Sequence, residues 1–209
     1  MASPADAFDR RNLLTYLSLL FGVGAIAAAA GGRASLAGFA IAVAVIADTF
    51  DGRFARRFGS DPRRSALGVQ LDSLADAIAF GIAPPLCSAL LFYGGVDAMT
   101  TAMWGIVFVH AACAITRLAS FNVDAAISGL GPPKPRSGEG GFIGIPVPLA
   151  ALTWSTALLV QPSAAVTAGL LLVTAAAMVL PLRVPRPTGV GLVLFTCWPV
   201  GVALWHLAR

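Results

Sequence analysis

Residues 47–85 read ADTFDGRFARRFGSDPRRSALGVQLDSLADAIAFGIAPP and hold five of the ten acidic residues of the chain in an apolar neighbourhood. Asp48 and Asp51 are three positions apart, and Asp72 and Asp76 are four apart. If both flanks of the stretch are helical, each pair lies on one helical face. We therefore expect two helices to bring the four carboxylates together.

Carboxylates gathered in an apolar environment need protons or cations, because each costs several kcal/mol to desolvate. Residues 47–85 contain no His or Cys that would indicate zinc, and carboxylate oxygens suit a hard divalent ion such as Mg²⁺, Mn²⁺ or Ca²⁺. Two ions would balance the four charges. Gly52 and Gly68 allow backbone to approach a ligand, and Arg53 and Arg56 follow the first acidic pair. This combination favours a pyrophosphate or phosphodiester ligand.

The composition indicates a polytopic membrane protein. The 209 residues are 57% hydrophobic and 11% charged, with a mean hydropathy of +0.82. Soluble domains have a charged fraction of about 25%. We expect one membrane domain over residues 1–209, in which 1–11 form a short cytoplasmic segment.

Seven segments approach the ~20 apolar residues that a helix needs to cross a membrane, so the sequence predicts an all-α bundle of about seven transmembrane helices. They are residues 13–30, 36–57, 65–92, 99–121, 143–160, 164–182 and 188–207. Gly81, Pro84 and Pro85 predict an interruption in the third helix. His110 and His206 lie in apolar segments, where we expect them to be core residues.

The basic residues sort to one side of the membrane. If the N-terminus is cytoplasmic, only Arg33 and Arg209 fall outside. The cytoplasmic set is Arg10, Arg11, Arg53, Arg56, Arg57, Arg63, Arg64, Arg117, Lys134, Arg136, Arg183 and Arg186. This asymmetry places the four Asp residues at the cytoplasmic face. The net charge of +4 therefore reflects basic residues at the cytoplasmic membrane surface, where they attract anionic lipid head groups, and no nucleic-acid partner is expected.

The acidic stretch resembles the signature of the CDP-alcohol phosphotransferase (phosphatidyltransferase) family, whose members are integral membrane enzymes of phospholipid synthesis. The likeness is carried by Asp48-x-x-Asp51-Gly52-x-x-Ala55-Arg56 and by Gly68-x-x-x-Asp72-x-x-x-Asp76, which fill all eight fixed positions. The gap between Arg56 and Gly68 is a few residues longer than the family pattern.

The resemblance implies a six-helix family core plus an extra helix, a homodimer, and an active site at the cytoplasmic membrane face. It implies two Mg²⁺ or Mn²⁺ ions held by Asp48, Asp51, Asp72 and Asp76, with Asp76 also the general base. Gly52, Ala55, Arg56 and Gly68 would bind the CDP moiety of CDP-diacylglycerol, and CMP would be the leaving group. The resemblance also implies the lipid bilayer of the cytoplasmic (inner) membrane of the cell as the setting.

Further runs resemble the phosphatidylserine synthase branch of the family. They are LDSLAD (71–76) with FGIAP (80–84), RLASFNV (117–123) and FIGIPVPLAA (142–151). Ser120 replaces an arginine of the branch pattern. The expected acceptor is then L-serine, and Arg117, followed by Lys134 and Arg136, is the candidate to bind its carboxylate.

Two other interpretations stay open. Inositol phosphate, glycerol phosphate or choline as acceptor would keep the metal chemistry and change only the acceptor pocket. A cation transporter would explain acidic pairs within the membrane, but it would not explain the spacing of Gly52, Ala55, Arg56 and Gly68.

Overall fold

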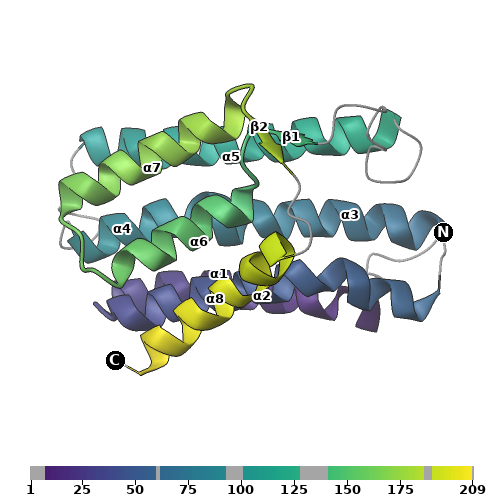
Figure 1. Cartoon of the computed structure of the whole chain (residues 1–209), viewed down its shortest axis with the longest axis horizontal. Helices are drawn as coiled ribbons and strands as arrows, with labels where there is room; N and C mark the ends of the chain where they lie inside the picture. Colours follow the sequence, from purple (N-terminus) through teal and green to yellow (C-terminus); the bar gives the residue numbers. More distant parts are fainter. Residues whose placement is uncertain (1–7, 60–61, 93–100, 128–140, 186–189, 209) are drawn as a thin grey trace.

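The computed structural model describes residues 8–59, 62–92, 101–127, 141–185 and 190–208. Its helices are α1 (Leu13–Ala30), α2 (Ala34–Ala55), α3 (Pro62–Asp76), α4 (Ala83–Phe92), α5 (Thr101–Ile127), α6 (Val147–Leu158), α7 (Ala164–Val179) and α8 (Val190–Leu207). Two 3₁₀ turns, η2 (Arg10–Asn12) and η3 (Arg56–Phe58), flank α1 and α2, and the π-helical turn η4 (Ala77–Ile82) joins α3 to α4. Figure 1 shows these elements along the long axis of the molecule.

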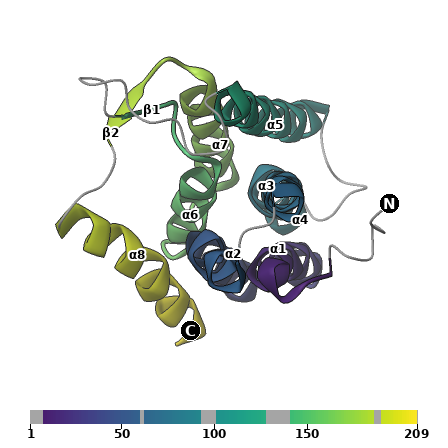
Figure 2. The same cartoon turned by 90° about the vertical axis from the view of Figure 1, so that its right-hand side faces the viewer.

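The helices surround one central helix made of α3, η4 and α4. α4 packs on α1, α5, α6 and α7, and η4 packs on α1, α5 and α6. Figure 2, which views the bundle from one end, shows the central helix between α5, α6 and α1, with α8 outside against α2. The prediction of an all-α membrane fold is confirmed.

Four helices in the described part of the chain are long and apolar enough to cross a membrane: Arg10–Ala30, Ala34–Phe58, Pro62–Phe92 and Thr101–Asp124. The other three predicted segments are also helical but shorter, at Val147–Leu158, Ala164–Val179 and Val193–Leu207. The predicted segment 143–160 was too long, because its first residues are extended and the helix begins after Pro146. At 12 residues α6 spans about 18 Å, less than the ~30 Å hydrocarbon core.

Small side chains allow the helices of the core to approach closely. α1 and α2 meet through alanines that are almost fully buried, such as Ala25, Ala28 and Ala37. Gly22 of α1 lies against η4, where an added Cβ would stand 2.6 Å from the Cα and Cβ atoms of Ala79. Small residues commonly occupy helix contacts in membranes, where close van der Waals packing replaces the hydrophobic effect.

The expected interruption of the third helix is a widening instead of a break. Pro84 and Pro85 have no N–H groups, so in an α-helix the carbonyls of Phe80 and Gly81 would lack their donors. The chain forms the π-helical turn η4 here, with the Ala83 N–H bonded to the Ile78 carbonyl, and then continues as α4. Ser88 Oγ donates to the Pro84 carbonyl at 2.9 Å, and Trp154 Nε1 donates to Ser88 Oγ at 2.6 Å.

A short antiparallel ribbon, which was not expected from the sequence, joins the two ends of the α6–α7 hairpin. Strands β1 (Gly141–Ile143) and β2 (Arg183–Pro185) pair through Phe142 and Val184. The Gly144 N–H then donates to the Leu182 carbonyl at 2.8 Å. Gly144 has φ +72, and an added Cβ would collide with the Met178 carbonyl, so the position requires glycine.

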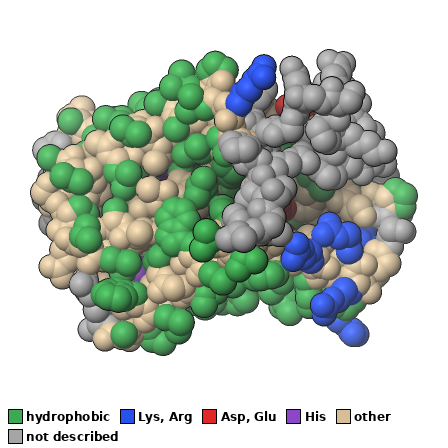
Figure 3. All heavy atoms as spheres, viewed as in Figure 1, with side chains coloured by type: hydrophobic (Ala, Val, Ile, Leu, Met, Phe, Trp, Pro, Cys, Tyr) green, Lys and Arg blue, Asp and Glu red, His purple; other side chains and the backbone are tan. Residues whose placement is uncertain are grey.

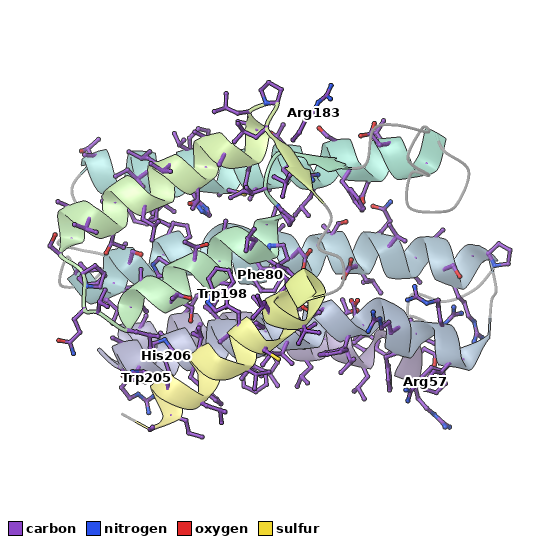
Figure 4. All side chains as sticks on the ribbon, viewed as in Figure 1. Arg57, Phe80, Arg183, Trp198, Trp205 and His206 are labelled. Carbon is purple, nitrogen blue, oxygen red and sulfur yellow. The ribbon has the colours of Figure 1, made fainter. Side chains whose placement is uncertain are left out.

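The last helix, α8, packs on α2 and makes polar contacts with α6 through His206 and Trp198, which Figure 4 labels. His206 Nε2 lies 2.9 Å from the Ser155 carbonyl, and Ser155 Oγ donates to the Gly38 carbonyl at 2.7 Å. A Cβ at Gly38 would overlap the His206 ring. Midway along α8, Trp198 Nε1 donates to Thr156 Oγ1 at 3.1 Å. His206 is thus buried in the core, as expected.

Gly22→Ala is expected to destabilise the fold, because its methyl group would overlap Ala79 and force α1 and η4 apart. The expected cost is about 1–3 kcal/mol, measured as a lower apparent Tm in detergent. Gly24→Ala is the matched control, since an added Cβ there meets nothing within 4 Å. Equal Tm values for both variants would show that the Gly22 contact does not limit stability.

Candidate metal and nucleotide site

Three of the four predicted carboxylates meet between α2 and α3. Asp48, Asp72 and Asp76 each offer one oxygen atom, and these atoms lie within 4.8 Å of one another. Asp76 is buried, with 7% of its surface exposed, whereas Asp48 and Asp72 are half-buried. The spacing of the residues along each helix therefore produces the convergence that the sequence predicted.

Asp51 lies beside this group, one helical turn after Asp48. Its Oδ2 accepts a hydrogen bond of 3.2 Å from Thr15 Oγ1 of α1, and its side chain also interacts with that of Asp72. α1 packs against both α2 and α3 and so holds the two acidic faces at a fixed separation. All four predicted acids thus belong to one cluster.

A cavity of about 500 Å³ adjoins the cluster. Six of the residues predicted for the metal and nucleotide sites line it: Asp51, Gly52, Ala55, Arg56, Gly68 and Asp72. Gly52 and Ala55 have small side chains and leave space along the α2 side of the cavity. The nearest atom to a Cβ added at Gly52 would be Arg56 Nη1, at 3.8 Å. The cavity therefore has a cationic and small-residue wall beside an acidic end.

The N-terminal turn and the start of α1 supply part of the cavity wall, although the sequence alone did not place them in the site. Arg11, Asn12 and Thr15 line the cavity together with Arg64 and Ser65 of α3. Arg11 Nη2 donates to Ser65 Oγ at 3.4 Å, and Arg64 Nη1 lies 3.3 Å from Asp9 Oδ2. A Cβ on Gly68 would stand 3.4 Å from Asn12 Oδ1, so the glycine leaves room for the Asn12 side chain to line the cavity.

One end of the molecule collects the positive charge around this cavity. Figure 3 shows most of the visible Lys and Arg side chains toward one end, while hydrophobic side chains are spread over the other half of the face. In Figure 4, Arg57 marks this end and His206 lies toward the opposite one. The acidic cluster thus lies near the basic end of the bundle, since Arg11, Arg56 and Arg64 line the same cavity as two of its acids.

Comparison with known proteins agrees with this geometry. The family model described as CDP-alcohol phosphatidyltransferase matches residues 11–198. The chain belongs to this family. It is an integral membrane protein, as the sequence predicted.

Relatives of the chain within the family include serine phosphatidyltransferases. The chain is 35% identical over 140 residues to the CDP-diacylglycerol–serine O-phosphatidyltransferase of Mycobacterium leprae, covering 67% of this chain and 43% of the relative. It is 35% identical over 145 residues to the Helicobacter pylori (strain 26695) protein of that name, covering 68% and 53%. The archaetidylserine synthase of Methanothermobacter thermautotrophicus is 30% identical over 182 residues, covering 86% and 71%. The chain thus spans about half the length of the first two relatives.

The donor set of the cluster fits a divalent metal ion, on which members of this family generally depend. Its ligands are all carboxylate oxygens, which Mg²⁺ and Mn²⁺ prefer. Oxygens that share one Mg²⁺ lie about 4 Å apart at most, so a spacing within 4.8 Å requires little adjustment. A cation would also relieve the repulsion among the carboxylates.

The predicted acceptor residues have different outcomes. Arg117 of α5 is half-buried, and its guanidinium lies 5.8 Å from the Phe121 ring centroid. Its buried Nε has no hydrogen-bond partner among the described residues. Arg117 does not line the cavity, whereas Lys134 and Arg136 lie outside the described residues.

Arg117 lies on α5 at about the same level along the bundle as Asp76 on the central helix. The Ser73 hydroxyl donates to Asn122 Oδ1 at 3.0 Å, and a Cβ at Gly81 would stand 3.0 Å from the Ala114 Cβ. Arg117 lies between these two contacts on α5, as Asp76 does on the central helix.

Mn²⁺ is expected to raise the apparent Tm of the protein in detergent, because it binds the folded cluster. At a free concentration of 100 times Kd, the stabilisation would be about 2.7 kcal/mol. Asp72→Asn should lose this increase, since it removes a ligand oxygen that carries charge. Asp124→Asn, on an exposed position of α5, should keep it. The same Tm increase in Asp72→Asn would place the binding of Mn²⁺ elsewhere.

Proposed function

We propose that the protein transfers the phosphatidyl group of CDP-diacylglycerol to the hydroxyl of L-serine and releases CMP. The observation that carries the proposal is the convergence of Asp48, Asp72 and Asp76 beside a cavity lined by small residues and arginines. The names of the relatives support serine as the acceptor. Residues 1–209 would form one catalytic membrane domain, and residues 1–11 its cytoplasmic N-terminal segment.

In this reaction the serine oxygen attacks the phosphorus that carries the diacylglycerol. The bond from that phosphorus to the bridging oxygen breaks, and CMP leaves with the electron pair. Asp76 accepts the hydroxyl proton as the general base, since it is the most buried acid of the cluster. Two Mg²⁺ or Mn²⁺ ions bound by Asp48, Asp51, Asp72 and Asp76 would neutralise the pyrophosphate and the departing phosphate.

The cavity beside the cluster is the proposed site for the CDP moiety. Gly52, Ala55 and Gly68 give the nucleotide close access to the helix backbones. Arg56 supplies a guanidinium that can bind phosphate oxygens. The acyl chains would extend into the bilayer beside the apolar outer surface of the helices.

We further propose that the protein lies in the inner (cytoplasmic) membrane of the cell. Its active site and its N-terminus would both face the cytoplasm. The basic end of the bundle supports this orientation. A soluble acceptor and divalent ions are available on that side. A homodimer remains part of the proposal from family resemblance alone.

Arg117 is the proposed partner of the serine carboxylate. It lies at the depth of Asp76, and its Nε has no hydrogen-bond partner in the described part of the chain. A fixed guanidinium at this depth can orient an amino acid whose hydroxyl must reach the cluster.

The reaction is tested by measuring CMP release from CDP-diacylglycerol by purified protein in detergent with Mn²⁺. Release is expected with L-serine, and not with inositol phosphate, glycerol phosphate or choline. Asp48→Asn should lower the rate more than about 100-fold, because loss of outer partners of a metal site alone costs about 10–100-fold. Release with a different alcohol only would reassign the acceptor, and no release with any acceptor would contradict the proposal.

Arg117→Gln should raise the KM for serine by about tenfold or more, the loss expected for a hydrogen bond between charged groups. The KM for CDP-diacylglycerol should change little. Arg57→Gln, an exposed arginine at the same end of the bundle, is the charge-matched control. If the two variants give the same serine KM, another residue binds the carboxylate.

A further inference from the structure

A buried histidine contacts the π-helical turn that comes directly after the last acidic residue. His110 of α5 is 1% exposed, and its Nδ1 lies 3.1 Å from the carbonyl oxygen of Gly81 in η4. A carbonyl can only accept a hydrogen bond. His110 therefore carries its hydrogen on Nδ1 and donates it to Gly81.

The Gly81 carbonyl lies where the chain lacks the donor that an α-helix would supply. In an α-helix its partner would be the N–H of residue 85, and Pro85 has none. An unsatisfied carbonyl within the apolar core of a membrane protein costs several kcal/mol. His110 thus satisfies a backbone group that the proline leaves open, and the bond crosses from α5 to the central helix.

The turn that His110 stabilises sets the direction of the acidic face. η4 begins directly after Asp76, and it holds an extra residue per turn relative to an α-helix. Each residue added to a helix rotates the segment before it by about 100° relative to the segment after it. Because α4 is anchored through Ser88 and Trp154, this rotation determines where α3 points Asp72 and Asp76.

We propose that His110 is a positioning residue for the carboxylate cluster. By holding η4 in its widened form, it keeps Asp72 and Asp76 turned toward Asp48. The inference rests on the proposed function, because it assigns His110 to the geometry of the same metal site. His110 would touch neither substrate nor metal, and it would act through the backbone of the central helix.

The chain contains a matched control for this idea. His206 is also buried, at 4% exposure, and its Nε2 lies 2.9 Å from a helix carbonyl, that of Ser155. It joins α8 to α6 and α2, away from the acidic pair of α3. Loss of a buried imidazole is therefore comparable at the two positions, whereas only His110 contacts η4.

The experiment measures Mn²⁺ binding by the full-length protein in detergent, by calorimetry or electron paramagnetic resonance, without substrate. His110→Leu should raise the Mn²⁺ Kd by about tenfold, the lower end of the range for partners outside the ligand shell. His110→Asn, whose amide nitrogen can donate in place of Nδ1, should restore most of the affinity. His206→Leu should lower the apparent Tm and leave the Kd unchanged.

Gly81→Ala tests the same turn without removing the histidine, because its methyl group would press on Ala114. It should weaken Mn²⁺ binding in the same direction, and it serves if His110→Leu does not fold. An unchanged Kd in the folded His110 and Gly81 variants would overturn the inference. So would an equal loss of affinity in His206→Leu. If the unaltered protein itself does not bind Mn²⁺, the proposed function fails instead.

Discussion

The helix bundle must hold several carboxylates close together in a largely buried place. Asp48, Asp72 and Asp76 would repel one another if they were charged and alone, and burial makes the repulsion stronger. The bundle must therefore supply rigidity from its other contacts. α1 provides much of it, because it packs on α2, α3 and η4 and donates the Thr15 hydroxyl to Asp51.

The central helix is held by polar contacts at its weakest point. Two consecutive prolines remove two backbone donors in mid-helix, and the His110 side chain of α5 supplies a donor for one of the freed carbonyls, that of Gly81. Within α4, Ser88 donates to the Pro84 carbonyl and accepts a hydrogen bond from the Trp154 indole, which joins the central helix to α6. Close contacts of Gly22 and Gly81 with their neighbouring helices then fix the turn sterically. Asp72 and Asp76 thus precede a part of the central helix, η4 and α4, that is held by contacts with its neighbours.

The sequence predicted the acidic cluster well because its information is local. Separations of three and four residues define a helical face, and small residues beside the acids indicate access for a ligand. The sequence did not place the N-terminal turn at the cavity. Arg11 and Arg64 come to line the cavity through contacts between residues far apart in the chain. The same limit applies to the pairing of β1 with β2, which depends on how α6 and α7 return the chain. Pro84 and Pro85 indicated a disturbed helix, but only the partners of the freed carbonyls decide between a break and a widened turn.

The contact between Gly38 and His206 has a consequence for how this sequence can diverge. The imidazole occupies the space that a side chain at position 38 would need, while Ser155 bridges the two helices beside it. A substitution at either site alone would leave a steric clash or a void. The two positions are therefore expected to covary among descendants of this chain, with bulk moving from one helix to the other.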